Sequence, residues 1–140
     1  KRSPNEKLNI GVIGAGGKGV VDSDGCATEN IIALCDVDSR TLAARKKQYP
    51  KAKVYRDYRK MLEEMGDKLD AVTVSTPDHH HFPASMLAMK MGLHVYVQKP
   101  LAHSVWEARK MLETSRKYKV ITQMGNQGHS YDSTDRKSVV

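Results

Sequence analysis

Three glycines near the start of the chain are spaced in a way that suits the binding of a phosphate. The stretch GAGGKG follows an apolar run and gives a Gly-x-Gly-x-x-Gly pattern. Such glycines allow a tight turn and let the backbone come close to an anion, while the helix that follows offers unpaired N–H groups. The alternative is a turn in which the glycines serve only the fold. We expect the pyrophosphate of a dinucleotide to lie against Gly14, Gly16, Gly17, Lys18 and Gly19.

An acidic residue ends the next apolar run, NIIALCDVD. Asp36 follows Gly16 by 20 positions (36 − 16 = 20), the spacing at which a carboxylate accepts hydrogen bonds from the ribose of a bound dinucleotide. Its negative charge would repel a 2′-phosphate, so the sequence favours NAD over NADP as the cofactor. Arg40 lies four residues later and could pair with that phosphate, which leaves NADP open.

Two further groups of polar residues follow apolar runs. The stretch STPDHHH begins with Ser75, Thr76 and Pro77, and VYVQKP contains Lys99. Ligands of open α/β sheets bind beyond the carboxyl ends of the strands, so we expect Thr76 and its neighbours beside the cofactor. Lys99 is either a solvated strand end or a cation at the rim of a binding cleft. Adjacent histidine side chains diverge on a turn or helix, so the triplet predicts no metal site.

These residues need a scaffold in which strands and helices alternate. Apolar runs rich in Val and Ile indicate buried strands within 8–16, 30–38, 52–57, 69–77, 93–100 and 119–125. The alternation predicts an α/β fold, a Rossmann-type doubly wound parallel sheet in a single domain. We assign the chain to an N-terminal tail, the domain and a polar C-terminal tail, with bounds 1–7, 8–125 and 126–140.

Helix-capping residues mark most of the helical segments. Asp38 and Asp57 each precede a helical pattern, Ser104 and Glu107 have the spacing of a capping box, and Gly92 is a helix stop. The helix after Ser104 carries residues at helical spacing that we expect on its apolar side: Val105, Ala108, Met111, Leu112 and Ser115.

The composition narrows the classes of partner. The chain has 140 residues, with 23 Lys and Arg against 16 Asp and Glu, a formal net charge of +7. The basic residues are spread over helix faces and aromatics make up only 6%, so the sequence does not favour a nucleic-acid partner. No stretch has the eighteen or so apolar residues of a membrane span. Cys26 and Cys35 lack metal-ligand spacing, and we expect buried free thiols.

The first residues, KRSPNEKLN, do not include a Met. Removal of an export signal and a trimmed start leave the same trace, so the compartment stays open. The cytoplasm is the default expectation and export the alternative.

The motifs occur in an order that resembles one known family. GAGGKG, ALCDVD, VSTPDHHH, HVYVQKPLA and ITQMGNQGHS together are similar to the Gfo/Idh/MocA oxidoreductases, from about residue 8 to residue 130. The resemblance implies an NAD(P)-binding Rossmann domain, followed in the full-length protein by a second domain that binds a sugar, a polyol or a related alcohol. It also implies that the full-length protein is a homo-oligomer.

The same resemblance implies roles for particular residues. VQKP matches the family's Glu-Lys-Pro signature, which makes Lys99 the catalytic candidate and implies a cis peptide before Pro100. An ammonium there would stabilise the charge that develops on an alcohol oxygen as hydride leaves. Gln98 stands where the family has Glu, so Lys99 lacks that ion-pair partner, although the amide could still contact the cofactor.

Three other residues are carried over from the family. His81 matches the histidine of the Thr-Pro turn, and Asn126 and Gln127 follow the last apolar run, where they could reach the nicotinamide. The family's histidine and aspartate acid/base lie in the second domain, so we expect this chain to bind NAD with little turnover. Two alternatives remain: an NAD-dependent glycoside hydrolase that oxidises its sugar transiently, and a non-catalytic NAD-sensing module.

Overall fold

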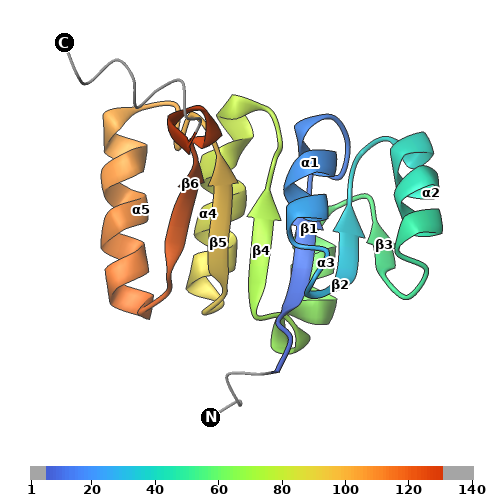
Figure 1. The fold of residues 1–140 in the computed structure, drawn as a ribbon. Coiled ribbons are helices and arrows are strands. Elements are labelled where there is room, and N and C mark those ends of the chain that lie inside the picture. The colour runs from blue at the N-terminus through green and yellow to red at the C-terminus, as the bar shows by residue number, and fades with distance from the viewer. Residues whose placement is uncertain (1–5, 131–140) are drawn as a thin grey trace.

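Six parallel strands form one sheet in the order β3-β2-β1-β4-β5-β6 (Figure 1). The structure, a computed structural model, describes residues 6–130. This strand order is that of a dinucleotide-binding Rossmann fold, so the predicted fold class is confirmed. The strands are β1 Asn9–Ile13, β2 Asn30–Cys35, β3 Lys53–Tyr55, β4 Ala71–Val74, β5 His94–Gln98 and β6 Thr122–Gly125.

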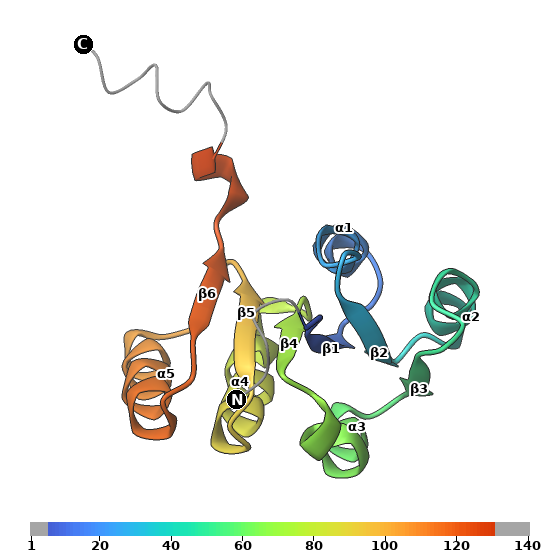
Figure 2. The same ribbon diagram turned by 60° about the horizontal axis from the view of Figure 1, so that its bottom comes forward.

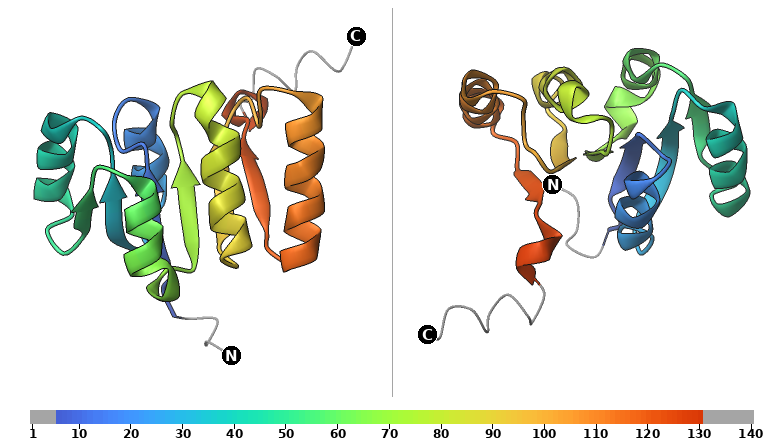
Figure 3. Two further views of the ribbon diagram at one scale, coloured as in Figure 1. Left: turned by 180° about the vertical axis from the view of Figure 1, so that it is seen from behind. Right: turned by 90° about the horizontal axis from the view of Figure 1, so that it is seen from above.

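Helices lie on both faces of the sheet (Figures 2 and 3). The helices α1 Lys18–Gly25 and α2 Ser39–Gln48 lie on one face, and α3 Tyr58–Met65, α4 His81–Lys90 and α5 Val105–Tyr118 lie on the other. The strand centres are therefore buried: Val12, Leu34, Val74 and Val97 are all 0% exposed. Continuous apolar runs were the signal for such strands, because each successive side chain packs under a different layer of helices.

One part of the sheet has no helix over it among the described residues. On the face that carries α1, a shallow groove runs over β5 and β6 and is lined by His94, Tyr96, Ile121 and other residues. Ile121 is 72% exposed.

Of the helices within residues 6–130, none combines the length and apolar character that a bilayer crossing requires.

The predicted helix starts are confirmed. Asp38 accepts a hydrogen bond from Arg40 N (2.8 Å), and Asp57 accepts one from Arg59 N (2.9 Å). Ser104 begins α5 with a complete capping box. These side chains satisfy N–H groups that a helix cannot pair internally.

The predicted apolar side of α5 is partly wrong. Val105 and Leu112 are 72% and 50% exposed. Met111 and Ser115 are buried as expected, and Thr114, which was not expected there, is buried beside them. The buried stripe is rotated toward small polar residues because α5 packs closely against α4. Ser115 Oγ donates to the Leu112 carbonyl (2.9 Å), which lets this hydroxyl be buried at low cost.

Two smaller expectations need adjustment. Cys35 is buried, but Cys26 is only half-buried, and both are free. Part of the expected polar tail forms a short 3₁₀ helix, η3 Gln127–Ser130, directly after β6. The remainder of both predicted tails, 1–5 and 131–140, lies outside the described residues.

Candidate functional site

The glycine loop connects β1 to α1 and is shaped by two very close backbone approaches. Gly14 has φ +84°, and a Cβ there would lie 2.6 Å from the Ser75 carbonyl oxygen. A Cβ on Gly19 would lie only 1.8 Å from the Gly14 carbonyl oxygen. Side chains at these two positions would collide with backbone, so the folded loop itself requires both glycines.

The middle of the loop leaves donors for a ligand. Gly17, the N-cap residue of α1, has φ 51° and no side chain caps the helix. Within residues 6–130, no hydrogen-bond partner is found for the N–H groups of Gly17 and Lys18. A Cβ on Gly16 would lie 3.1 Å from Thr41 Cγ2, which is a side-chain atom, so it would not collide with backbone. Unpaired N–H groups at a helix start attract anions, which is the property that a diphosphate needs.

Asp36 is fixed beside this loop at the end of β2. Its Oδ2 accepts a hydrogen bond from Gly16 N (3.0 Å), and its Oδ1 accepts one from Asp38 N (2.9 Å). A carboxylate can accept about four hydrogen bonds, so lone pairs remain for the hydroxyls of a sugar. The carboxylate is thus held rigidly at the edge of the glycine loop.

A cleft of about 320 Å³ opens at the carboxyl ends of β1, β2 and β4. Thr76 Oγ1 in its wall is buried and has no hydrogen-bond partner within residues 6–130. Sequence reasoning found Gly14, Gly16, Asp36 and the residues after β4, but missed the remaining walls. The cleft is lined by Ile13, Gly14, Gly16, Cys35, Asp36, Val37, Arg56, Tyr58, Ser75, Thr76, Pro77, His79 and His80.

The missed residues include Arg56 in the β3–α3 loop, Tyr58 at the start of α3, and His79 and His80 in the short helix η2, Asp78–His80. Arg56 Nη2 donates to the Val37 carbonyl (3.1 Å), which joins two residues that line the cleft. Tyr58 and His80 meet edge-to-face with ring centroids 5.1 Å apart. Burial, together with the charge of His79, lowers the pKa of His80, so its neutral form is favoured. For the residues that follow β3, the available signal was that β3 lies next to β2 in the sheet, which brings them beside the end of β2.

Two of the predicted cations are occupied elsewhere. Arg40 Nη2 pairs with Asp38 Oδ2 (3.0 Å) at the start of α2, and the side chain is 90% exposed. Lys18 Nζ pairs with Asp22 Oδ1 (2.8 Å) one turn along α1. Neither residue lines the cleft, and their contact with the cofactor stays a prediction.

His81 lies under the cleft rather than in its wall. It is 1% exposed, with Nε2 2.8 Å from the Thr76 carbonyl oxygen and Nδ1 2.6 Å from the Pro100 carbonyl oxygen. The ring therefore joins the loop after β4 to the turn after β5. The geometry gives His81 a role in positioning these loops, while direct contact with a cofactor stays a prediction.

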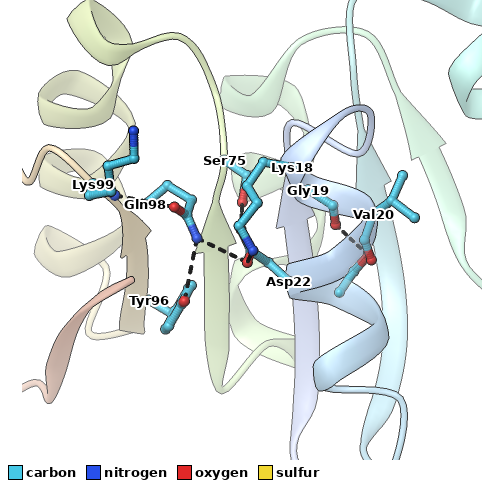
Figure 4. A network of polar contacts seen from close by, with 9 residues as sticks. Lys18, Gly19, Val20, Asp22, Ser75, Tyr96, Gln98 and Lys99 are labelled. Atoms are coloured by element: carbon cyan, nitrogen blue, oxygen red, sulfur yellow. Dashed lines mark hydrogen bonds and ion pairs between the residues drawn. The ribbon is translucent and has the colours of Figure 1, made fainter. Parts of the chain in front are cut away.

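Lys99 and Gln98 occupy the end of β5 (Figure 4). Gln98 is 5% exposed, whereas Lys99 is exposed and points away from the buried polar contacts beside it. No ion pair of Lys99 is found among the described residues. The Lys99–Pro100 peptide is cis, as the family resemblance implies.

Asn126 and Gln127 lie beyond β6, and neither lines the cleft. Asn126 is exposed, and its N–H donates to the Met124 carbonyl (2.9 Å). Gln127 lines a second hollow of about 310 Å³ with Lys18, Asp22 and Tyr96, and its Oε1 has no partner within residues 6–130. Across the same residues, no group of three His, Cys, Asp or Glu side chains converges as a metal site would require.

The described residues fit a nicotinamide dinucleotide. The uncapped helix start suits a diphosphate, the Asp36 carboxylate suits ribose hydroxyls, and the unpaired Thr76 Oγ1 suits a polar group of the ligand. The elongated cleft connects the last two.

Comparison with known proteins decides the family. Residues 8–126 match the family model GFO_IDH_MocA, described as an oxidoreductase family with an NAD-binding Rossmann fold. The chain belongs to this family. Both the resemblance noted in the motifs and NAD as the family's cofactor are thereby confirmed.

Curated relatives agree with this assignment, and a solved structure shares the fold. D-glucoside 3-dehydrogenase from Escherichia coli is 32% identical over 114 residues, covering 79% of this chain and 32% of that protein. Alpha-N-acetylgalactosaminidase from Shewanella oneidensis is 32% identical over 124 residues, covering 80% and 27%. The WlbA dehydrogenase from Chromobacterium violaceum, solved with NADH and UDP-GlcNAcA, has a TM-score of 0.83 at 21% identity, over 96% of this chain and 39% of that one. The chain therefore spans only 32% of the length of the first of these proteins and 27% of the second.

Proposed function

We propose that this chain is the NAD-binding domain of an oxidoreductase that transfers hydride between the nicotinamide and a sugar, polyol or related alcohol. The observation that carries the proposal is a cleft lined by Gly16 of the glycine loop, by the fixed Asp36 carboxylate and by Thr76, beside the uncapped start of α1. The relatives named as sugar and inositol dehydrogenases support the class of substrate.

Each part of the bound cofactor would have its own protein groups. The N–H groups of Gly17 and Lys18 would hold the diphosphate, and Asp36 would accept from the adenosine ribose. NAD supplies the hydride acceptor when it is bound. Lys99 at the end of β5 would place its ammonium beside the substrate oxygen and stabilise negative charge there.

We expect the chain alone to bind NAD with little turnover. Hydride transfer requires the alcohol to be held against the nicotinamide and its proton to be accepted. The exposed Lys99 has no carboxylate or histidine partner among residues 6–130 that could relay this proton.

A second candidate is glycoside hydrolysis with transient oxidation of the sugar. Several relatives at 30–33% identity are named glycosyl hydrolase family 109 proteins. The same NAD cleft serves both reactions, but only the dehydrogenase accumulates NADH. Absorbance at the NADH band during turnover of the longer protein would separate the two.

The proposal is tested by calorimetric titration of the chain with NAD and with NADP. We expect NAD to bind more tightly than NADP, and Asp36→Asn to raise the NADP-to-NAD affinity ratio by about tenfold or more, because it removes a negative charge next to the 2′ position. Asp67→Asn is the control, since Asp67 is exposed and lies before β4, at the amino ends of the strands and so opposite to the cleft. A wild-type chain that binds neither nucleotide would refute the proposal.

A further inference from the structure

A buried carboxylate on α1 faces the ends of two strands of the sheet. Asp22 is 8% exposed and receives three hydrogen bonds (Figure 4). Its donors are Lys18 Nζ at 2.8 Å, Ser75 Oγ at 2.7 Å and Gln98 Nε2 at 2.9 Å. These hydrogen bonds tie α1 to the loop after β4 and to the end of β5.

Asp22 determines which way the Gln98 amide points. An ionised carboxylate only accepts hydrogen bonds, so the NH₂ group of Gln98 must face it. The Gln98 Oε1 is thereby directed to the other side, where it lies 3.3 Å from Lys99 N and accepts its N–H. The same Nε2 also lies 3.4 Å from the Tyr96 hydroxyl. One carboxylate thus fixes the side chain that in turn contacts the backbone of Lys99.

We propose that Asp22 is a positioning residue of the cofactor site, acting on Lys99 through Gln98 and on the loop after β4 through Ser75. This inference rests on the proposed function of the cleft. Ser75 lines that cleft and precedes Thr76, whose Oγ1 lacks a partner in the described part of the chain. Asp22 itself lies behind the site and lines the second hollow instead.

The contact also explains why position 98 is an amide in this chain. A glutamate there would place two carboxylates at the 2.9 Å separation that Asp22 and Gln98 now have. Two carboxylates this close, both withdrawn from water, cannot both be ionised, so one must take up a proton or the pair must separate. The departure from the Glu-Lys-Pro signature at Gln98 is therefore matched by the carboxylate that α1 supplies.

Three other ionisable groups lie near Asp22: Lys18 on the same helix, Cys26 directly after that helix, and Tyr96 on β5. Lys18 is its ion-pair partner. Burial raises the pKa of Tyr96, and the negative charge of Asp22 raises it further. Burial likewise raises the pKa of the Cys26 thiol, again with a contribution from Asp22. Tyr96 and Cys26 therefore stay neutral near pH 7, and the local charge is carried by Asp22 and Lys18.

A charge-swap series tests the inference on the whole chain, with NAD alone as the ligand. The variants are Gln98→Glu, Asp22→Asn and the double variant, and each is titrated with NAD at about pH 5.5 and about pH 8.5. Gln98→Glu should bind NAD about tenfold or more weakly at the higher pH than at the lower, because ionisation of both carboxylates separates the pair. The double variant restores one amide and one carboxylate and should bind within about threefold of the wild type at both values.

Melting temperatures measured on the same samples separate folding from positioning. Gln123→Glu is the matched control, because Gln123 is exposed on the neighbouring strand β6 and its side chain donates to the Met124 carbonyl. It should bind NAD like the wild type at both pH values. If Gln98→Glu follows the pH behaviour of this control while the wild type binds NAD, the positioning role is overturned and the proposed function stands.

Two further results are decisive. A wild type that fails to bind NAD would refute the proposed function. If, in that case, Gln98→Glu still shows a pH-dependent melting temperature that the double variant rescues, the contact between Asp22 and Gln98 is only structural and the positioning role is overturned. A double variant as impaired as Gln98→Glu would also overturn it, because the exchange of charge would not restore the site.

Discussion

The glycine loop permits a graded test of which glycines serve the fold and which serve the cofactor. Gly19→Ala places a methyl group 1.8 Å from the Gly14 carbonyl oxygen, so backbone must shift. Gly16→Ala has no backbone among its nearest contacts: its Cβ would lie 3.1 Å from Thr41 Cγ2 and 3.5 Å from Asp36 Oδ2, at the wall of the cleft. Gly25→Ala at the end of α1 has open space around it and is the matched control.

The geometry translates into separate magnitudes for the three variants. Forcing a group into closely packed backbone costs about 3 kcal/mol or more, which for a chain of this size lowers the melting temperature by about 12 °C. Gly16→Ala requires a small adjustment of one side chain and should cost about 1 kcal/mol or less. Gly25→Ala should raise stability by about 0.5 kcal/mol, because alanine restricts the unfolded chain.

Urea unfolding and NAD titration on the same samples test this order. We expect Gly19→Ala to be the least stable of the three. Gly16→Ala should stay folded with NAD affinity reduced about tenfold or more, since its methyl group occupies the approach of the diphosphate. Gly25→Ala should bind NAD as the wild type does. A Gly16→Ala chain with full NAD affinity would show that the middle glycine is only structural and would refute the reasoning.

Two further predictions follow from ionisable groups of the fold. The Arg45 guanidinium, which donates to Asp24 Oδ1 at 2.8 Å, lowers the pKa of Asp24 below its ordinary 3.8, so this ion pair stabilises the fold above that pH and is lost as the pH falls through the native value. Asp24→Asn should therefore flatten the acid-side loss of unfolding free energy, measured by urea titration from about pH 5 to about pH 2; an unchanged slope would contradict this. Burial, followed by the charges of Asp36 and Asp57, raises the pKa of Cys35 to about 12. Its thiol should resist maleimide at pH 8 in the native chain and react in urea, as read by mass spectrometry, whereas equal rates in both conditions would show that it is accessible.

Much of the fold could be predicted because local signals and burial agree. The apolar runs around Val12, Val74 and Val97 become central strands, since the parallel sheet buries both of their faces. Caps at Asp38 and Ser104 begin helices where expected because their side chains bond the first N–H groups. The face of α5 was harder, because Val105 and Leu112 are apolar by type but exposed, and Thr114 is polar by type but buried by close packing.

The candidate site was predictable where one motif supplies it and not where the fold assembles it. Gly14, Gly16 and Asp36 follow fixed spacings along the chain and do meet in one cleft. Arg56 from the β3–α3 loop and Tyr58 from the start of α3 join that cleft, and no local pattern identifies them as part of a site. The pairing of Asp22 with Gln98 spans 76 positions and becomes visible only in three dimensions.

His81 makes the rim of the cleft behave as one piece. A single planar ring lies between the Thr76 and Pro100 carbonyl oxygens, with Nε2 2.8 Å from the first and Nδ1 2.6 Å from the second, so its rigid outline links their positions. Any force that a ligand exerts on the loop after β4 is therefore shared with the turn that follows Lys99. The loop after β4 and the turn after Lys99 are far apart in the sequence, yet they stiffen together. When a ligand orders one of them, the other has less conformational entropy left to lose.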